Sequence, residues 1–146
     1  MPPNRLSEPR QGAEIRLLGR TFLCQYQLRL VNLYGGEPGI RDAGVLEDML
    51  ESVQILVEEG ADIFVVAGRY VEGLLSCPFS DSNLRLAVIA MGTVIRVNGF
   101  RFNPPAEVLL DMISALNNRA LDTAALTEWL RAQSTPVESD FEGESG

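Results

Sequence analysis

The sequence predicts an all-α domain of six or seven helices around two buried central ones, with at most a small β-hairpin flap. Apolar residues recur at spacings of three and four over most of the chain, which is the periodicity of amphipathic helices. Alternating patterns typical of strands are scarce. With 146 residues, of which 46% are hydrophobic, the chain is long enough for one domain with a sizeable core.

The first two helices are predicted on either side of a glycine-rich stretch. Thr21 can cap a helix that ends at Gly35 and Gly36, because glycine favours the end of a helix. Asp42 can cap the next helix, whose apolar positions run from Val45 to Leu56. The stretch between the two helices reads GGEPGIRD and is expected to be a loop.

The two central helices are predicted from their more thoroughly apolar composition. One extends from Ala61 to Ser76, and the other carries inward-facing residues from Leu86 to Val97. Asn98-Gly99 is expected to end the second helix with a left-handed turn.

Two further helices and one short strand are expected after these. Asn103 can cap a helix with Pro104 in its first turn, where a missing N–H costs nothing. Asp122 can cap the last helix. Residues 100–102 are the best strand, and the glycine-rich loop is a candidate pairing partner.

The ends of the chain are expected to lie outside the packed domain. Residues 1–18 are interpreted as a flexible N-terminal arm, residues 19–133 as the domain, and residues 134–146 as a disordered acidic tail without apolar periodicity. No run of eighteen apolar residues and no apolar signal core is present, so we expect no membrane partner and a cytoplasmic location.

Charge and cysteine content limit the function further. The net charge is −8, and residues 1–132 contain 12 basic and 16 acidic residues, a net of −4, which argues against nucleic acid as a partner. The two cysteines, Cys24 and Cys77, are expected to be free thiols. The chain has no histidine, the usual general base near neutral pH.

The stretch CPFSDSNLR, residues 77–85, has the parts of a nucleotide-phosphate site. Helix N-termini have unsatisfied N–H groups and a partial positive charge, and Ser82 and Asn83 lie where those amides are expected. Arg85 can offer a fork of donors to a phosphate, and Asp81 is a ligand of the kind that magnesium prefers. The alternative is a helix start without function, in which one of three residues is the cap and a phenylalanine packs into the core: Ser80, Asp81 or Ser82, with Phe79.

The same stretch resembles the signature loop of the Fic/Doc (Fido-domain) family. That signature is His, Pro or a similar residue, Phe, any residue, Asp or Glu, Gly or Ala, Asn, Lys or Gly, and Arg. Here it stands as Cys77-Pro78-Phe79-Ser80-Asp81-Ser82-Asn83-Leu84-Arg85. The chain is similar to the Doc (death-on-curing) branch from about Phe22 to Trp129, through YGGEPGIRDAGVLEDML (34–50), ADIFVVAGRYVEGLLSCPF (61–79) and IRVNGFRF (95–102).

The resemblance implies a Fido fold and a transferase site. Family members move AMP, or in Doc-type members a phosphate, from a nucleotide to a hydroxyl of a target protein, with the signature His as general base. By position, Asp81 would hold Mg²⁺, while Ser82, Asn83 and Arg85 would contact the phosphates of ATP. The region that corresponds to the target-binding flap contains four residues of interest: Gly35, Gly36, Pro38 and Arg41.

The sequence departs from the family pattern at several positions. Cys77 replaces the His base, Ser82 the small Gly or Ala, and Leu84 the Lys common in the Doc branch. Gln27-Leu28 stands where Doc-like chains tend to have His-Asp. Loss of a general base typically lowers the rate by a factor of about a hundred to ten thousand. Cys77 is a poor candidate for a nucleophile, because the chain has neither histidine nor lysine to activate it.

These departures predict a degenerate Doc/Fic-like protein with lost or much reduced transfer. We expect it to act by binding a partner protein, such as an antitoxin-like segment, or by holding a nucleotide weakly with Mg²⁺. The alternative is an active protein-modifying transferase, an AMPylating enzyme or a Doc-type kinase toxin, with an altered motif.

Overall fold

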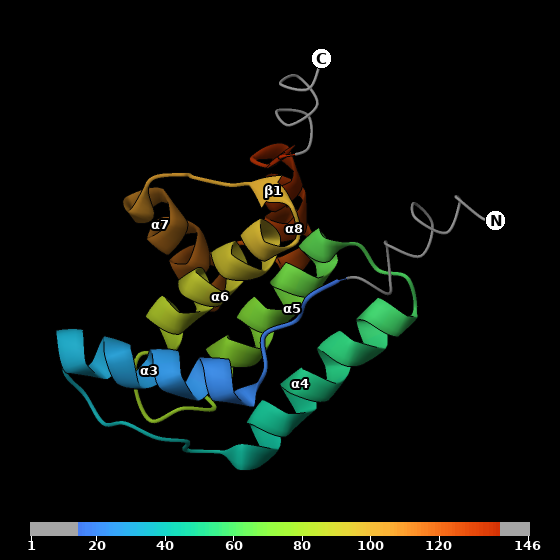
Figure 1. Cartoon of the computed structure of the whole chain (residues 1–146). Coiled ribbons are helices and arrows are strands. Elements are labelled where there is room, and N and C mark those ends of the chain that lie inside the picture. Colours follow the sequence, from blue (N-terminus) through green and yellow to red (C-terminus); the bar gives the residue numbers. More distant parts are fainter. Residues whose placement is uncertain (1–14, 138–146) are drawn as a thin grey trace.

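The computed structural model describes residues 15–137, and this part of the chain is mostly helical (Figure 1). Its elements in chain order are α3 (Arg20–Tyr34), α4 (Ala43–Glu58), α5 (Ile63–Leu75), α6 (Asn83–Val97), β1 (Phe100–Arg101), α7 (Ala106–Asn117), α8 (Thr123–Ala132) and β2 (Thr135–Pro136). Six helices and one two-stranded sheet within the described residues confirm the predicted all-α class with a small hairpin. Residues 1–14 of the predicted arm and 138–146 of the predicted tail lie outside this part.

The core is built on α5 and α6, as the apolar composition of their sequences predicts. The two helices pack more extensively against each other than any other pair. Of the outer helices, α4 and α8 pack on α5, whereas α3 and α7 pack on α6 (Figure 1). None of the described helices is both long enough and apolar enough to cross a membrane.

Aspartates cap three of the helices. Asp42 accepts a hydrogen bond from the amide of Val45 at the start of α4, and Asp122 accepts one from Ala125 at the start of α8, which confirms both predicted caps. Asp62 caps α5 in the same way. Each cap satisfies a helical amide that would otherwise have no partner.

Two predicted helix starts are wrong. Thr21 is the second residue of α3 and not its N-cap, because the helix begins at Arg20 and its N-cap is Gly19. Asn103 does not cap α7, whose N-cap is Pro105. The reason is steric in the second case, because a residue that precedes a proline is disfavoured in the helical region, and Pro104 precedes Pro105.

The strand at residues 100–101 pairs with a different segment from the predicted one. Strand β1 pairs antiparallel with β2, with Phe100 opposite Pro136 and Arg101 opposite Thr135. The glycine-rich loop instead forms a single bridge between Ile40 and Phe79. The residues that form β2 belong to the segment predicted as the tail, and they are ordered by this pairing although their side chains are exposed.

The packed domain begins earlier than predicted. Leu18 is buried, and both its amide and its carbonyl bond the hydroxyl of Tyr70 at 2.8 Å. Burial raises the pKa of Tyr70 to about 12, so the hydroxyl stays neutral and can donate and accept at once. Arg16 is held by the side chain of Asn98 through both its amide and its carbonyl. Residues 15–18, assigned to the arm from the sequence, therefore pack on the central helices.

Because Asp62 and Arg131 form an ion pair, we expect the free energy of unfolding to decrease at acid pH. The Arg131 guanidinium lies 2.7 Å from the Asp62 carboxylate. Burial raises the pKa of Asp62, but the hydrogen bond from Arg131 and the amides of Val65 and Phe64 outweigh it, so the pKa lies below its ordinary value. A lowered folded-state pKa contributes stability that is complete above the unfolded pKa and is lost as pH falls through the folded pKa.

We therefore expect wild type to exceed Asp62→Asn in melting temperature by a gap that is constant above about pH 5 and closes below about pH 3. Asparagine retains the N-cap, so the variant removes mainly the charge. Because the Asp62 side chain is 50% exposed, the gap should be small and should narrow in high salt. A gap that stays the same at pH 3 and pH 6 would contradict the assignment.

A candidate site at two joined loops

The signature loop, residues 77–85, and the glycine-rich loop, residues 35–42, lie against each other near the end of α3 (Figure 1). Three backbone hydrogen bonds join them: Arg41 N to Pro78 O at 2.7 Å, Asp42 N to Pro78 O at 3.0 Å, and Ser80 N to Gly39 O at 3.0 Å. The chain thus brings together the two segments that the sequence singled out, although they are about forty residues apart.

Gln27 is the buried link between the two loops and α3. Its side-chain amide donates to the carbonyl of Glu37 at 3.1 Å and to that of Asp81 at 3.0 Å. Its side-chain oxygen accepts from the amide of Gly39 at 3.0 Å. Gln27 is 1% exposed, so its three hydrogen bonds hold both loops from the inside.

From the sequence, Gln27 was recognisable only as a departure from a family pattern, and its role as a link was not predicted. The missed signal was its place on the buried face of α3, between Leu23 and Leu30. A polar residue on the apolar stripe of a helix must find partners for its amide, and here it finds them in two loops.

Arg41 and Cys77 form another link between the loops. The Arg41 guanidinium donates to the carbonyl of Cys77 at 2.9 Å from Nε and 2.6 Å from Nη2. Cys77 has a φ of +59°, and its exposed thiol makes a long contact of 3.7 Å with the carbonyl of Leu75. Both cysteines are free, as predicted. Arg41, assigned to the target flap, thus anchors the backbone of the signature loop.

The carboxylate of Asp81 is tied to the glycine-rich loop. Its Oδ2 accepts a hydrogen bond from the amide of Glu37 at 2.7 Å. A β-carbon at Gly36 would lie 2.9 Å from that of Asp81, so the two backbones approach closely. The described residues contain no group of three or more histidine, cysteine or acidic side chains able to hold a metal. Magnesium bound mainly through phosphates and one carboxylate does not require such a group.

Asn83 closes the signature loop on itself. Its side-chain oxygen accepts from the amide of Phe79 at 3.1 Å, and its nitrogen donates to the carbonyl of Phe79 at 2.9 Å. The Phe79 ring is completely buried. Both polar atoms of Asn83 are used in shaping the loop, whereas the resemblance assigned this side chain to a phosphate.

Arg85 stacks on an aromatic ring from the end of α3. Its guanidinium carbon lies 4.0 Å from the centre of the Tyr34 ring, which is a cation–π geometry. Leu84, at the position where the Doc branch has a lysine, is half-buried and packs against the core. The remaining cation of the loop is therefore Arg85, and its flat face is covered by Tyr34.

The alternative interpretation predicted a side-chain cap at the start of α6, and the structure has no such cap there. Ser82 occupies the N-cap position with a φ of +67°, and no side chain caps the helix. Phe79, in contrast, is inserted into the core as that interpretation expected. Within the described residues, the first helical amides, those of Asn83 and Leu84, have no acceptor. Such amides can bind an anion.

The flap residues Gly35, Gly36 and Pro38 are all exposed beside the signature loop.

Comparison with known proteins adds no identity: neither a scan against protein-family models nor a search of curated proteins finds a match.

Proposed function

We propose that the chain is a degenerate Doc/Fic-like protein that acts in the cytoplasm by binding a partner protein, with lost or much reduced transfer of AMP or phosphate. One observation carries this proposal. Of the side chains that the resemblance assigns to phosphate, Asn83 spends both polar atoms on its own loop and Arg85 stacks its face on Tyr34. The metal-ligand position, Asp81, accepts a hydrogen bond from the amide of Glu37.

The missing base supports the same conclusion. Transfer to a protein hydroxyl needs a group that accepts its proton, and a thiol at position 77 is a poor substitute for imidazole. The chain contains no histidine or lysine to take over this task.

The candidate partner surface is the exposed end of α3 beside the two loops. Leu33 is 71% exposed and Tyr34 is 59% exposed, and Tyr34 carries the stacked guanidinium of Arg85. Tyrosine and arginine are enriched among residues that contribute most to protein interfaces. An antitoxin-like segment with apolar and acidic side chains would be complementary to this surface.

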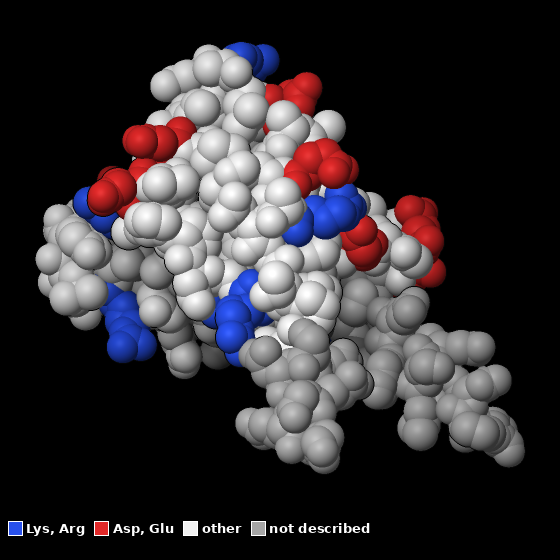
Figure 2. Space-filling model, turned by 90° about the horizontal axis from the view of Figure 1, so that it is seen from above, with Lys and Arg blue, Asp and Glu red and all other residues white. Residues whose placement is uncertain are grey.

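Nucleic acid is a weaker candidate for the partner. On the face shown in Figure 2, basic side chains stand singly or in small groups, with acidic side chains between them. Nucleic-acid surfaces usually gather many basic groups on one face. The net charge of −8 also opposes a polyanionic partner.

An active transferase is the second candidate function. The observation that favours it is the uncapped start of α6, where free amides and the positive helix end could hold a phosphate. In that case Mg²⁺ would bind at Asp81 and a phosphate of ATP at the amides of Asn83 and Leu84. Arg85 could then offer the N–H edge of its stacked guanidinium to the phosphate.

One experiment on the full chain separates the two candidates. We expect no transfer of label from ATP labelled at the α- or γ-phosphate to lysate proteins by wild type, and at most weak, Mg²⁺-dependent ATP binding by calorimetry. The matched variant is Cys77→His with Leu84→Lys, which restores the missing base and cation. The left-handed backbone at position 77 suits histidine, which is one of the residues enriched there.

The outcomes of this experiment are distinct. Transfer by the double variant alone would support a degenerate transferase, in which only the base and the cation were lost. Transfer by wild type would establish the active alternative. If Arg85→Ala binds Mg²⁺-ATP about ten- to a hundredfold more weakly than wild type, then Arg85 contacts phosphate through the N–H edge that the Tyr34 ring leaves open.

A further inference from the structure

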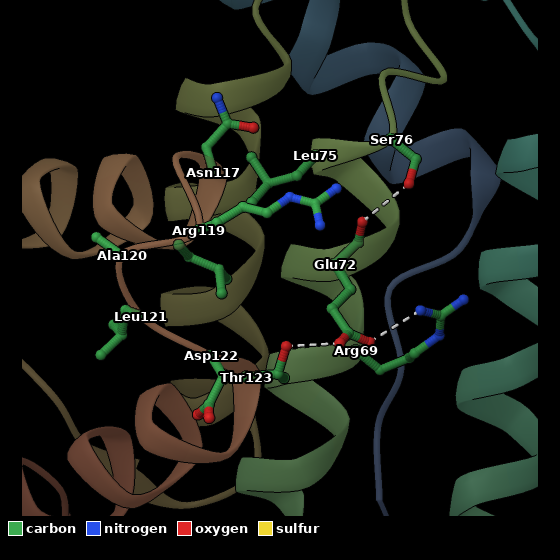
Figure 3. A pocket seen from close by; sticks show the side chains of 11 residues that line it. Arg69, Glu72, Leu75, Ser76, Asn117, Arg119, Ala120, Leu121, Asp122 and Thr123 are labelled. Carbon is green, nitrogen blue, oxygen red and sulfur yellow. Dashed lines mark hydrogen bonds and ion pairs between the residues drawn. The ribbon is translucent and has the colours of Figure 1, made fainter.

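A second concave feature lies on the other side of α5 from α4. It is an open pocket of about 770 Å³ between α5, the end of α7 and the start of α8 (Figure 3). Pockets for small molecules commonly have volumes of this order. None of the residues of the signature loop or the glycine-rich loop lines it, although its lining residue Ser76 directly precedes Cys77 and accepts from Arg41 at 3.5 Å.

Arg119 supplies an available cation to this pocket. Among the residues that the structure describes, no acceptor, carboxylate or aromatic ring pairs with its guanidinium. Figure 3 shows the side chain extended across the pocket toward Leu75 and Glu72. A guanidinium in a concavity without a partner is suited to bind an anion through two parallel hydrogen bonds.

The backbone at Arg119 is unusual for an arginine. Helix α7 ends with two hydrogen bonds, from Ala120 N to Ala115 O at 2.8 Å and from Arg119 N to Leu116 O at 3.0 Å. This pattern is a Schellman motif, in which the residue at the Arg119 position adopts a left-handed conformation and is usually glycine. Arg119 has a φ of +63°, so an unfavoured residue is kept where glycine would be more stable.

The acidic side chain on the facing wall is already neutralised. Glu72 accepts a hydrogen bond from Arg69 at 3.0 Å and one from the hydroxyl of Thr123. Arg69 in turn donates to Ser52 at 2.7 Å. Asp122 uses one carboxylate oxygen to cap α8. Glu72 is thus paired with Arg69, whereas Asp122 keeps its charge and the guanidinium of Arg119 has no partner among the described residues.

We propose that this pocket binds a small organic carboxylate, with Arg119 as its anchor. The side-chain amide of Asn117 lines the pocket and can donate a hydrogen bond to the ligand, whereas the hydroxyl of Ser76 already donates to the carbonyl of Glu72 at 3.3 Å. Leucine side chains from α5, from α7 and from the turn before α8 line the rest and suit a short carbon skeleton: Leu75, Leu116 and Leu121. A positive charge that served only the negative end of α7 would not need to reach across to α5.

The test is a titration of the ¹⁵N-labelled full chain with sodium succinate, followed by NMR, with sodium chloride at matched ionic strength as the blank. We expect saturable shifts at the Arg119 Nε–H group and at the amides of Ser76 and Asn117, with a dissociation constant in the millimolar range or tighter. Arg119→Gly should lose this response. Arg29→Ala, on α3, is the control and should keep it.

Thermal melting of the same variants distinguishes lost binding from lost folding. Arg119→Gly should melt about 2–5 °C higher than wild type, because glycine suits the left-handed position. A variant that is more stable yet no longer binds succinate supports the proposal. The proposal is overturned by equal shifts with chloride, by no saturable shift in wild type, or by an unchanged response in Arg119→Gly.

Discussion

Replacing Gly73 with alanine should destabilise the protein by about 2–3 kcal/mol, although alanine is the better helix former. Gly73 is buried in the last turn of α5, on which α4 packs. A β-carbon there would overlap the Cγ and Sδ atoms of Met49 and lie 2.7 Å from its Cβ. Met49 is itself completely buried, so its side chain has no room to move away without shifting α4.

The matched control is Gly44→Ala, near the start of α4. Gly44 is exposed, and the nearest atom to an added β-carbon is Oδ1 of Asp42, at an ordinary contact distance of 3.4 Å. We expect this change to be neutral or stabilising by up to about 1 kcal/mol, which is the intrinsic helix preference. Chemical denaturation of both variants measures the difference. Equal stabilities would mean that α4 and α5 are not in the close contact described.

The elements that the sequence predicted well are those whose signals are local. Each helix capped by an aspartate, at Asp42 and Asp122, begins where the cap indicates, because the cap and the amide it satisfies are three residues apart. The end of α6 at Asn98-Gly99 is equally local, with Gly99 at a φ of +95°. The two buried helices were recognisable because they are apolar on nearly every face.

The strand pairing was not predictable in this way. Residues 100–101 pair with residues 135–136, and each strand is two residues long. A strand of that length carries no alternation, and one of its residues is Pro136. Helix α6, which precedes β1, and helix α8, which precedes β2, both pack on α5, and this packing brings the two distant segments together.

In the candidate site, too, the local features were predictable from the sequence and the contacts between distant residues were not. The sequence indicated which loop would begin α6 and that Phe79 could enter the core. It did not indicate that Arg85 would stack on Tyr34, or that Asp81 would accept from Glu37, because those partners are more than forty residues away. Arg119 was also missed, since no glycine marks the end of α7 in the sequence.

Gln27→Leu should release the two loops from α3 and lower the free energy of unfolding by about 2–4 kcal/mol. Leucine has a similar size but no polar atoms. The change would leave the carbonyls of Glu37 and Asp81 and the amide of Gly39 without their present partner. A buried polar group that loses its partner costs about 1–3 kcal/mol, and entry of water at this edge would offset part of that cost.

Gln25→Leu is the control for this change, because Gln25 lies on the same helix with its side chain exposed. We expect it to alter stability by less than about 0.5 kcal/mol. Hydrogen exchange then shows where the effect lies. If Gln27 holds the loops, the amides of Arg41, Asp42 and Ser80, which bond between the loops, lose protection in Gln27→Leu well before those of α5 and α6. Uniform loss of protection across the protein would instead mean that Gln27 supports the core as a whole, and that the loops are held closed by their backbone hydrogen bonds alone.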